Sequence, residues 1–192
     1  MPLFQADPCP KHLRQRRDEI RNTPITKPPL PWVELSMPLI GGLVEIGFSE
    51  TSDYLLAITW NGRGVFNCST GEKVARDAEN FGGDEPWYNG MHMKAQGIGP
   101  VAEQWIPLCG IWGGGLRRQT DDGWQIEEET LDWPIRTYLL KCKNQIGVLD
   151  IRKSFVATVI ERDSDIIAFG FSWSGKHLVL VQSHTLRLWK RD

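Results

Sequence analysis

A glycine-rich segment in the middle of the chain has the residue types that bind anions. In residues 110–118, GIWGGGLRR, glycines leave backbone amides accessible, and Arg117 and Arg118 follow directly. Accessible amides and guanidinium groups both hold carboxylates or phosphates. The segment lacks the G-x-x-x-x-G-K-[ST] pattern of a phosphate-binding loop. We therefore favour a structural role, a strand or bulge in which a neighbouring backbone occupies the space of the missing side chains.

An acidic and aromatic stretch precedes this segment. Residues 77–88 have the composition of a long loop, which includes Asp84, Glu85, Trp87 and Tyr88. Aromatic rings beside carboxylates on a loop suit a protein partner with a basic face. In the alternative interpretation the loop is merely solvated and Trp87 folds back over the core. The predicted partner-binding residues are Asp84, Glu85, Trp87, Tyr88, Trp112, Arg117 and Arg118.

Two further arginines flank one predicted hairpin. Arg63 lies in the sequence NGRG and Arg76 in the sequence ARD. A guanidinium group can bind a carboxylate or a phosphate with two parallel hydrogen bonds. We favour an ordinary structural ion pair at this hairpin over a ligand site.

The sequence contains no catalytic or metal-binding signature. G-x-S-x-G and H-E-x-x-H are both absent, and we expect His177 and His184 to be structural. The cysteines form no C-x-x-C pair, so we expect free thiols rather than a metal site or a disulfide framework. They are Cys9, Cys68, Cys109 and Cys142. We predict no catalytic residue, no metal and no cofactor.

Charge and hydropathy narrow the class of partner. The net charge is −2, and residues 1–38 carry six basic and four acidic side chains, which leaves the remainder acidic. Nucleic-acid binding is disfavoured because it needs a concentrated positive surface. The sequence shows neither a secretory signal nor an 18-residue apolar window, so we expect no membrane partner and a cytoplasmic location.

Proline and turn residues define the expected elements. Eight of the twelve prolines fall in residues 1–38, which predicts an extended arm with a short helix in KHLRQRRDEIRN. We expect the arm to pack on the body through Leu30, Trp32, Val33 and Leu35; a basic peptide that engages a partner is the alternative. From residue 39, apolar runs alternate with turns every eight to twelve residues. This spacing predicts an all-β, largely antiparallel domain over 39–192.

The chain also repeats itself. Residues 47–66, GFSETSDYLLAITWNGRGVF, align without a gap on residues 170–189, GFSWSGKHLVLVQSHTLRLW. The offset of 123 residues is three times 41, and 41 residues is a typical length for a four-stranded propeller blade. A third hairpin is expected over 136–150.

Both segments resemble blades of WD-repeat β-propellers, although neither carries a Trp-Asp pair or a Gly-His dipeptide. The resemblance implies a small or degenerate propeller-like body of about four antiparallel blades. A β-sandwich built from two similar hairpins is the alternative.

Three functional hypotheses remain open. The first is a non-enzymatic binding protein whose loops engage a protein partner; its size and acidity are similar to those of immunity proteins that neutralise bacterial toxins. The second is a small-molecule- or glycan-processing enzyme with a site near Gly110–Arg118. The third is a scaffold subunit that dimerises through an open β edge. The sequence leaves the oligomeric state undetermined.

Nine tryptophans fall into two groups. We expect Trp32, Trp60, Trp173 and Trp189, in the arm or in the repeated segments, to serve mainly in packing. The others lie in the non-repeating middle, where we expect the binding function. They are Trp87, Trp105, Trp112, Trp124 and Trp133.

Overall fold

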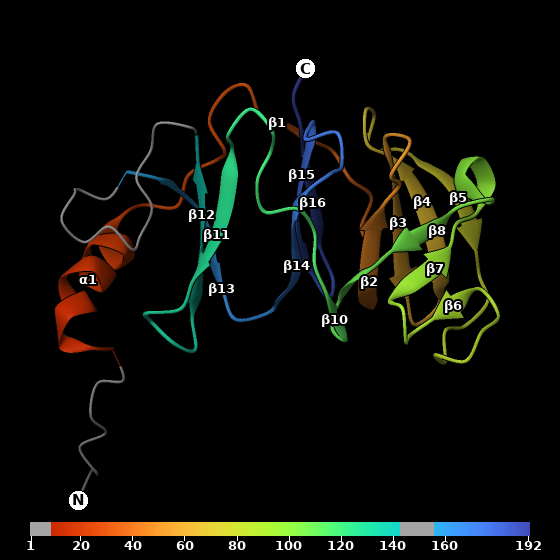
Figure 1. The fold of residues 1–192 in the computed structure, drawn as a ribbon, viewed down its shortest axis with the longest axis horizontal. Helices are drawn as coiled ribbons and strands as arrows, with labels where there is room; N and C mark the ends of the chain where they lie inside the picture. The colour runs from red at the N-terminus through yellow and green to blue at the C-terminus, as the bar shows by residue number, and fades with distance from the viewer. Residues whose placement is uncertain (1–8, 143–155) are drawn as a thin grey trace, which may run out of the picture. The chain divides into compact units, whose positions relative to one another are not determined.

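Short antiparallel strands make up most of the chain, as the turn spacing predicts. The structure is a computed structural model that describes residues 9–142 and 156–192 (Figure 1). The second half of the hairpin expected over 136–150 lies outside the described residues. The expectation is nevertheless wrong for residues 136–141, because residues 125–129 and 158–163 pair with the two edges of that strand and leave no edge for a hairpin partner.

The elements begin with η1 (Lys11–Leu13), α1 (Arg14–Asn22), β1 (Val33–Leu35), β2 (Leu43–Phe48), β3 (Tyr54–Thr59), β4 (Gly62–Asn67), β5 (Lys73–Asp77), β6 (Tyr88–Asn89), β7 (Lys94–Gln96) and η2 (Gly99–Val101). They continue with β8 (Trp105–Pro107), β9 (Cys109–Gly110), β10 (Gly113–Gly114), β11 (Gln125–Glu129), β12 (Arg136–Lys141), β13 (Thr158–Asp163), β14 (Ile166–Phe171), β15 (His177–Gln182) and β16 (Leu186–Lys190). The chain divides into two compact units, Met1–Pro29 with Asp122–Ser164 (unit 1) and Leu30–Asp121 with Asp165–Asp192 (unit 2). The sequence-based boundary at residue 38 stays a prediction.

In its described residues, unit 1 contains the short 3-10 helix η1, the α-helix α1 and one sheet. The sheet has the strand order β11-β12-β13. The predicted helix forms as η1 and α1, and Ile20 on α1 is buried against Leu139 and Val159. The guanidinium of Arg162 donates hydrogen bonds to the carbonyls of Ile20 and Thr23, which lie at the end of α1. These contacts supply a side-chain donor at the carbonyl end of the helix, where backbone carbonyls lack partners within the helix.

Unit 2 contains three antiparallel sheets, ordered β10-β9-β2-β3-β4-β5, β1-β16-β15-β14 and β6-β7-β8. Strand β3 shows how they stack, because successive side chains of a strand point to opposite faces. Leu55 and Ala57 belong to a core that includes buried residues of β15 and β16. Leu56 and Ile58, on the other face, belong to a core that includes buried residues of β7 and β8 (Figure 1). The six-stranded sheet is therefore covered on both faces at β3.

The sequence repeat is also a repeat of strand pairing. In one segment Leu55 faces Phe66 and Phe48 faces Leu55; in the other, Leu178 faces Trp189 and Phe171 faces Leu178. Every pair of β2 with β3, and every pair of β3 with β4 except Thr59 with Gly62, recurs at the offset of 123 residues. Even the register shift is kept, because it falls between Leu43 and Glu45 on β2 and between Ile166 and Ala168 on β14.

The arm packs through fewer side chains than expected. Trp32 is buried against Phe171 with the ring centroids 5.6 Å apart, as predicted. Leu30 and Val33, however, are 84% and 52% exposed. The physical reason is that residues 33–35 form β1 and pair along the edge of β16 through their backbone. This backbone pairing holds Val33 at the edge of the sheet without burying its side chain, and Leu30 precedes β1 and lies outside the pairing.

Candidate functional site

Five aromatic side chains of unit 2 form a connected group, which we call the aromatic cluster: Trp60, Phe81, Trp87, Tyr88 and Trp112. Phe81 stands at its centre, with ring centroids 4.8 Å from Tyr88, 5.5 Å from Trp87 and 5.6 Å from Trp112. The cluster joins the end of β3, the loop before β6 and the turn between β9 and β10. Most of these contacts are edge-to-face or tilted, the arrangement that aromatic quadrupoles favour.

The aromatic cluster has a buried base and an exposed top. Phe81 and Trp87 are buried, whereas Trp60 and Trp112 are each 48% exposed and meet edge to face at 5.8 Å. Ile111, also 48% exposed, precedes Trp112. Buried rings below hold the exposed rings in place, so a partner that covers them loses little side-chain entropy.

Arg63 fixes the base of the cluster. Its guanidinium carbon lies 4.2 Å from the centroid of the Trp87 ring, in cation–π geometry. The same guanidinium forms an ion pair with Asp77 at 3.1 Å and donates to the carbonyl of Gln96 at 2.6 Å. The structural interpretation of this hairpin is thus confirmed for Arg63. The Trp87 indole donates to Glu79 at 3.3 Å.

The acidic loop beside the cluster has one structural and one exposed carboxylate. Glu85 accepts hydrogen bonds from the backbone amides of Gly82 at 2.5 Å and Gly83 at 2.9 Å. Slight burial raises the pKa of Glu85, but the hydrogen bonds from backbone amides together lower it by more than burial raises it. The pKa of Glu85 therefore lies below its ordinary value. Asp84 is exposed. Glu85 therefore shapes the loop, and Asp84 is available to a partner.

A buried carboxyl group lies next to the cluster. Glu45 on β2 is fully buried, and neither carboxylate oxygen has a hydrogen-bond partner among the described residues. Burial raises its pKa to about 7; the Tyr88 hydroxyl opposes this rise from nearby but outside hydrogen-bonding geometry. Burial and the charge of Glu45 raise the pKa of Tyr88 to about 12.

The predicted arginines have structural partners of their own. Arg117 donates to Asp121 at 2.5 Å and to the carbonyl of Trp173 at 2.6 Å. Arg118 places its guanidinium carbon 3.2 Å from the centroid of the Phe169 ring. Of the seven predicted site residues, the structure thus brings Trp87, Tyr88 and Trp112 into one cluster, with Glu85 holding the loop beside them.

The glycines of residues 110–118 fit the structural interpretation. A Cβ atom on Gly110 would lie 2.1 Å from the carbonyl oxygen of Val44, and one on Gly114 would lie 2.1 Å from that of Leu108. Gly113 and Gly114 also have positive φ values of 116° and 77°. Close approach of β2, β9 and β10 and positive φ values account for Gly110, Gly113 and Gly114 without a bound anion, whereas Gly115 is not constrained in either way.

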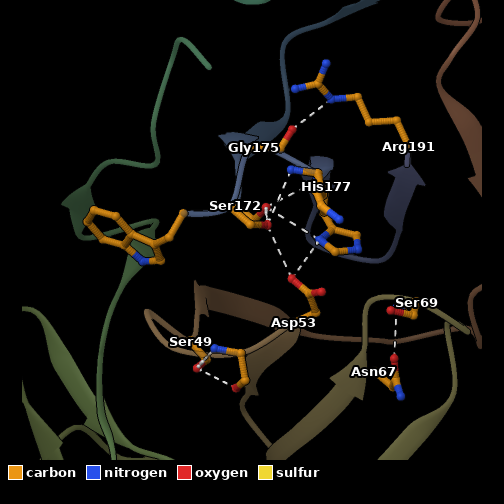
Figure 2. A network of polar contacts seen from close by, with 12 residues as sticks. Ser49, Asp53, Asn67, Ser69, Ser172, Gly175, His177 and Arg191 are labelled. Atoms are coloured by element: carbon orange, nitrogen blue, oxygen red, sulfur yellow. Dashed lines mark hydrogen bonds and ion pairs between the residues drawn. The ribbon is translucent and has the colours of Figure 1, made fainter. Parts of the chain in front are cut away.

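A serine, a histidine and an aspartate meet elsewhere in unit 2 (Figure 2). His177 Nδ1 lies 3.5 Å from the Asp53 carboxylate and 3.5 Å from Ser172 Oγ. A hydrolytic triad needs the aspartate and the serine on opposite ring nitrogens, whereas here both face Nδ1. Ser172 Oγ also accepts the His177 backbone amide at 3.1 Å, so the group closes a turn rather than forming a nucleophile.

Metal and membrane signatures are absent from the described part of the chain. There, no group of three or more His, Cys, Asp or Glu side chains is arranged to hold a metal ion. None of the described helices has the length and apolar character needed to span a membrane. Cys9, Cys68, Cys109 and Cys142 form no disulfide, and burial raises the pKa of Cys68.

No family model, curated protein or solved structure matches the chain.

Sequence reasoning missed Trp60 and Glu45. Trp60, expected to serve in packing, is half exposed and belongs to the aromatic cluster; Trp173 is also 44% exposed. Alternation along β3 was a signal for Trp60, since it follows Leu56 and Ile58 at spacing two and continues their face. No local signal marks Glu45 as buried.

Proposed function

We propose that this chain is a non-enzymatic binding protein that engages a protein partner through the exposed top of the aromatic cluster. The observation that carries the proposal is the pair of half-exposed tryptophans, Trp60 and Trp112, supported from below by buried Phe81 and Trp87. Tryptophan and tyrosine dominate the residues whose truncation costs most at protein interfaces. Exposed apolar rings gathered in one place also mark interaction sites.

Charge indicates a partner with a basic face. Asp84 and Glu79 are exposed beside the cluster, and the chain outside residues 1–38 carries net negative charge. Opposite charge on the partner would speed encounter and disfavour acidic competitors. A cytoplasmic immunity protein that covers the basic active site of a toxin is one form of this proposal.

The fold proposal is a propeller-like body. The units β2–β4 and β14–β16 support it, because they have the same strand register, have a register shift at the same place and pack through a shared core. A sandwich of two similar hairpins is the competing arrangement.

A comparison of tryptophan variants tests the proposed surface. Wild-type chain, Trp112→Ala and Trp133→Ala are each used to capture proteins from the source cell. Trp133 is 65% exposed and belongs to unit 1, so it controls for the loss of an exposed indole outside the cluster. We expect one stoichiometric basic protein that Trp133→Ala retains and that Trp112→Ala binds at least tenfold more weakly, because a central tryptophan contributes about 2 kcal/mol or more.

If the chain is an immunity protein, a second requirement applies to the captured partner. The captured protein must have a toxic activity that the wild-type chain inhibits in a purified mixture and that Trp112→Ala inhibits poorly. The absence of any stoichiometric partner, or equal capture by both variants, would exclude this surface as the binding site.

A further inference from the structure

A pocket lies on the other face of the six-stranded sheet from the aromatic cluster. It has a volume of about 290 Å³ and lies over β3, β4 and β5. Phe66 and Ala57, which face the core shared with β15 and β16, supply part of its apolar wall, and Ile40 supplies another part. The volume suits a small organic molecule.

Two glycines of β4 open the floor of the pocket, but for different reasons. Gly62 has a φ of 111°, and a Cβ atom there would lie 2.1 Å from the Asp77 carbonyl oxygen, so the turn itself requires glycine. At Gly64 the nearest atom to a Cβ would be the Ala75 carbonyl oxygen at 3.5 Å, an ordinary contact distance. The fold therefore tolerates a side chain at Gly64, and its absence leaves space in the pocket.

Two cations border this floor. Lys73 and Arg76 both come from β5, and both are exposed. The Lys73 chain passes over the floor, since its Cδ would lie 3.8 Å from a Cβ on Gly64. Among the described residues, neither Lys73 nor Arg76 forms an ion pair, whereas the charge of Arg63 is matched by Asp77. The pocket therefore has an excess of positive charge at its rim.

We propose that this pocket binds a small organic carboxylate with a flat apolar body. The apolar part lies on the bare backbone of Gly64 beside the alkyl chain of Lys73, whose ammonium lies 5.6 Å from the Phe66 ring centroid, and the carboxylate faces Arg76 and Lys73. A planar guanidinium matches a carboxylate with two parallel hydrogen bonds. The apolar wall favours an organic anion over inorganic phosphate, because phosphate alone would leave that wall solvated.

Titration with 2-naphthoate tests the proposal, with binding followed by ligand-observed NMR and calorimetry. We expect saturable binding that falls at least tenfold in Arg76→Gln and several-fold in Lys73→Gln. Lys176→Gln, which removes an exposed lysine outside the pocket, is expected to bind as the wild type does. The neutral amide 2-naphthamide is expected to bind at least tenfold more weakly, and inorganic phosphate at equal concentration is expected not to compete.

Gly64→Ala separates a filled pocket from a damaged fold. The variant is expected to keep the wild-type unfolding temperature and to lose most 2-naphthoate binding, because its methyl group occupies the floor. Equal binding by the wild type and Arg76→Gln, equal binding of acid and amide, or full binding by a stably folded Gly64→Ala would each overturn the proposal.

Discussion

Replacing Glu45 with glutamine tests whether an ionisable group inside unit 2 controls stability. The side chain is fully buried, and neither carboxylate oxygen has a hydrogen-bond partner in the described chain. Glutamine has nearly the same shape and cannot ionise. The variant should therefore remove the dependence of stability on the charge of residue 45 and leave the packing between β2 and β6–β8 almost unchanged.

The direction of the pKa change decides whether Glu45 lowers the stability of the fold at high pH or at low pH. Burial raises the pKa of Glu45 from 4.5 to about 7, so the folded chain binds a proton more tightly than the unfolded chain does. Its contribution to the free energy of unfolding is fully present below pH 4.5 and is lost as pH rises through 7. At about 1.4 kcal/mol per pKa unit, the whole change is worth about 3 kcal/mol.

Urea unfolding of wild type and Glu45→Gln at pH 5 and pH 8.5 measures this effect. The stability of the variant relative to the wild type is expected to rise by roughly 2–3 kcal/mol between the two pH values. Glu50→Gln, which removes an exposed carboxylate just after β2, controls for the loss of one negative charge. A variant whose difference from the wild type is the same at both pH values would refute a buried titrating Glu45.

Two further predictions concern stability. Burial lowers the pKa of His177, and Asp53 opposes this change, so the free energy of unfolding should fall as pH drops below about 6.5. Urea unfolding of His177→Gln should show a smaller fall than that of the wild type. An equal fall in both proteins would contradict a buried neutral imidazole. Gly110→Ala should cost roughly 2–4 kcal/mol in thermal unfolding because its Cβ meets the Val44 carbonyl, whereas Gly115→Ala, with nothing within 4 Å of its Cβ, should stay within about 0.5 kcal/mol. Equal effects at the two glycines would disprove the close packing of β9 on β2.

Local pattern was enough to predict the strands and their repeat. Turn glycines and apolar alternation act over a few residues, and the offset of 123 residues carries over into the pairing of β2–β4 and β14–β16. The helix in the arm was also predictable, since prolines bound it and a short helical run remains between them.

Which strands are covered on both faces by other sheets could not be predicted from local pattern. LVEIGF alternates loosely and indicates a half-buried strand, yet all six residues of β2 are buried. Strand β2 is hydrogen-bonded on both sides, and other sheets cover its faces. Glu45 is buried for this reason, and no neighbour in the sequence signals it.

The candidate site could be predicted only in part, because contacts between distant segments also assemble it. The sequence predicts Trp87, Tyr88 and Trp112 because loop aromatics are suited to recognition. Phe81, which joins them, could be added only once the chain had folded, whereas spacing along β3 already places Trp60 on the face of Leu56 and Ile58. Arg117 and Arg118 were chosen for their charge, but a charge in the sequence does not reveal the partner that neutralises it.

The pairing of β1 with β16 constrains the order of events during synthesis. Val33 pairs in register with Lys190, so the sheet that contains β1 can close only after β16 has been synthesised. Trp32 likewise has no Phe171 to cover it until β14 has been synthesised. The nascent chain thus carries an unpaired strand and an uncovered indole while the residues between these partners are synthesised.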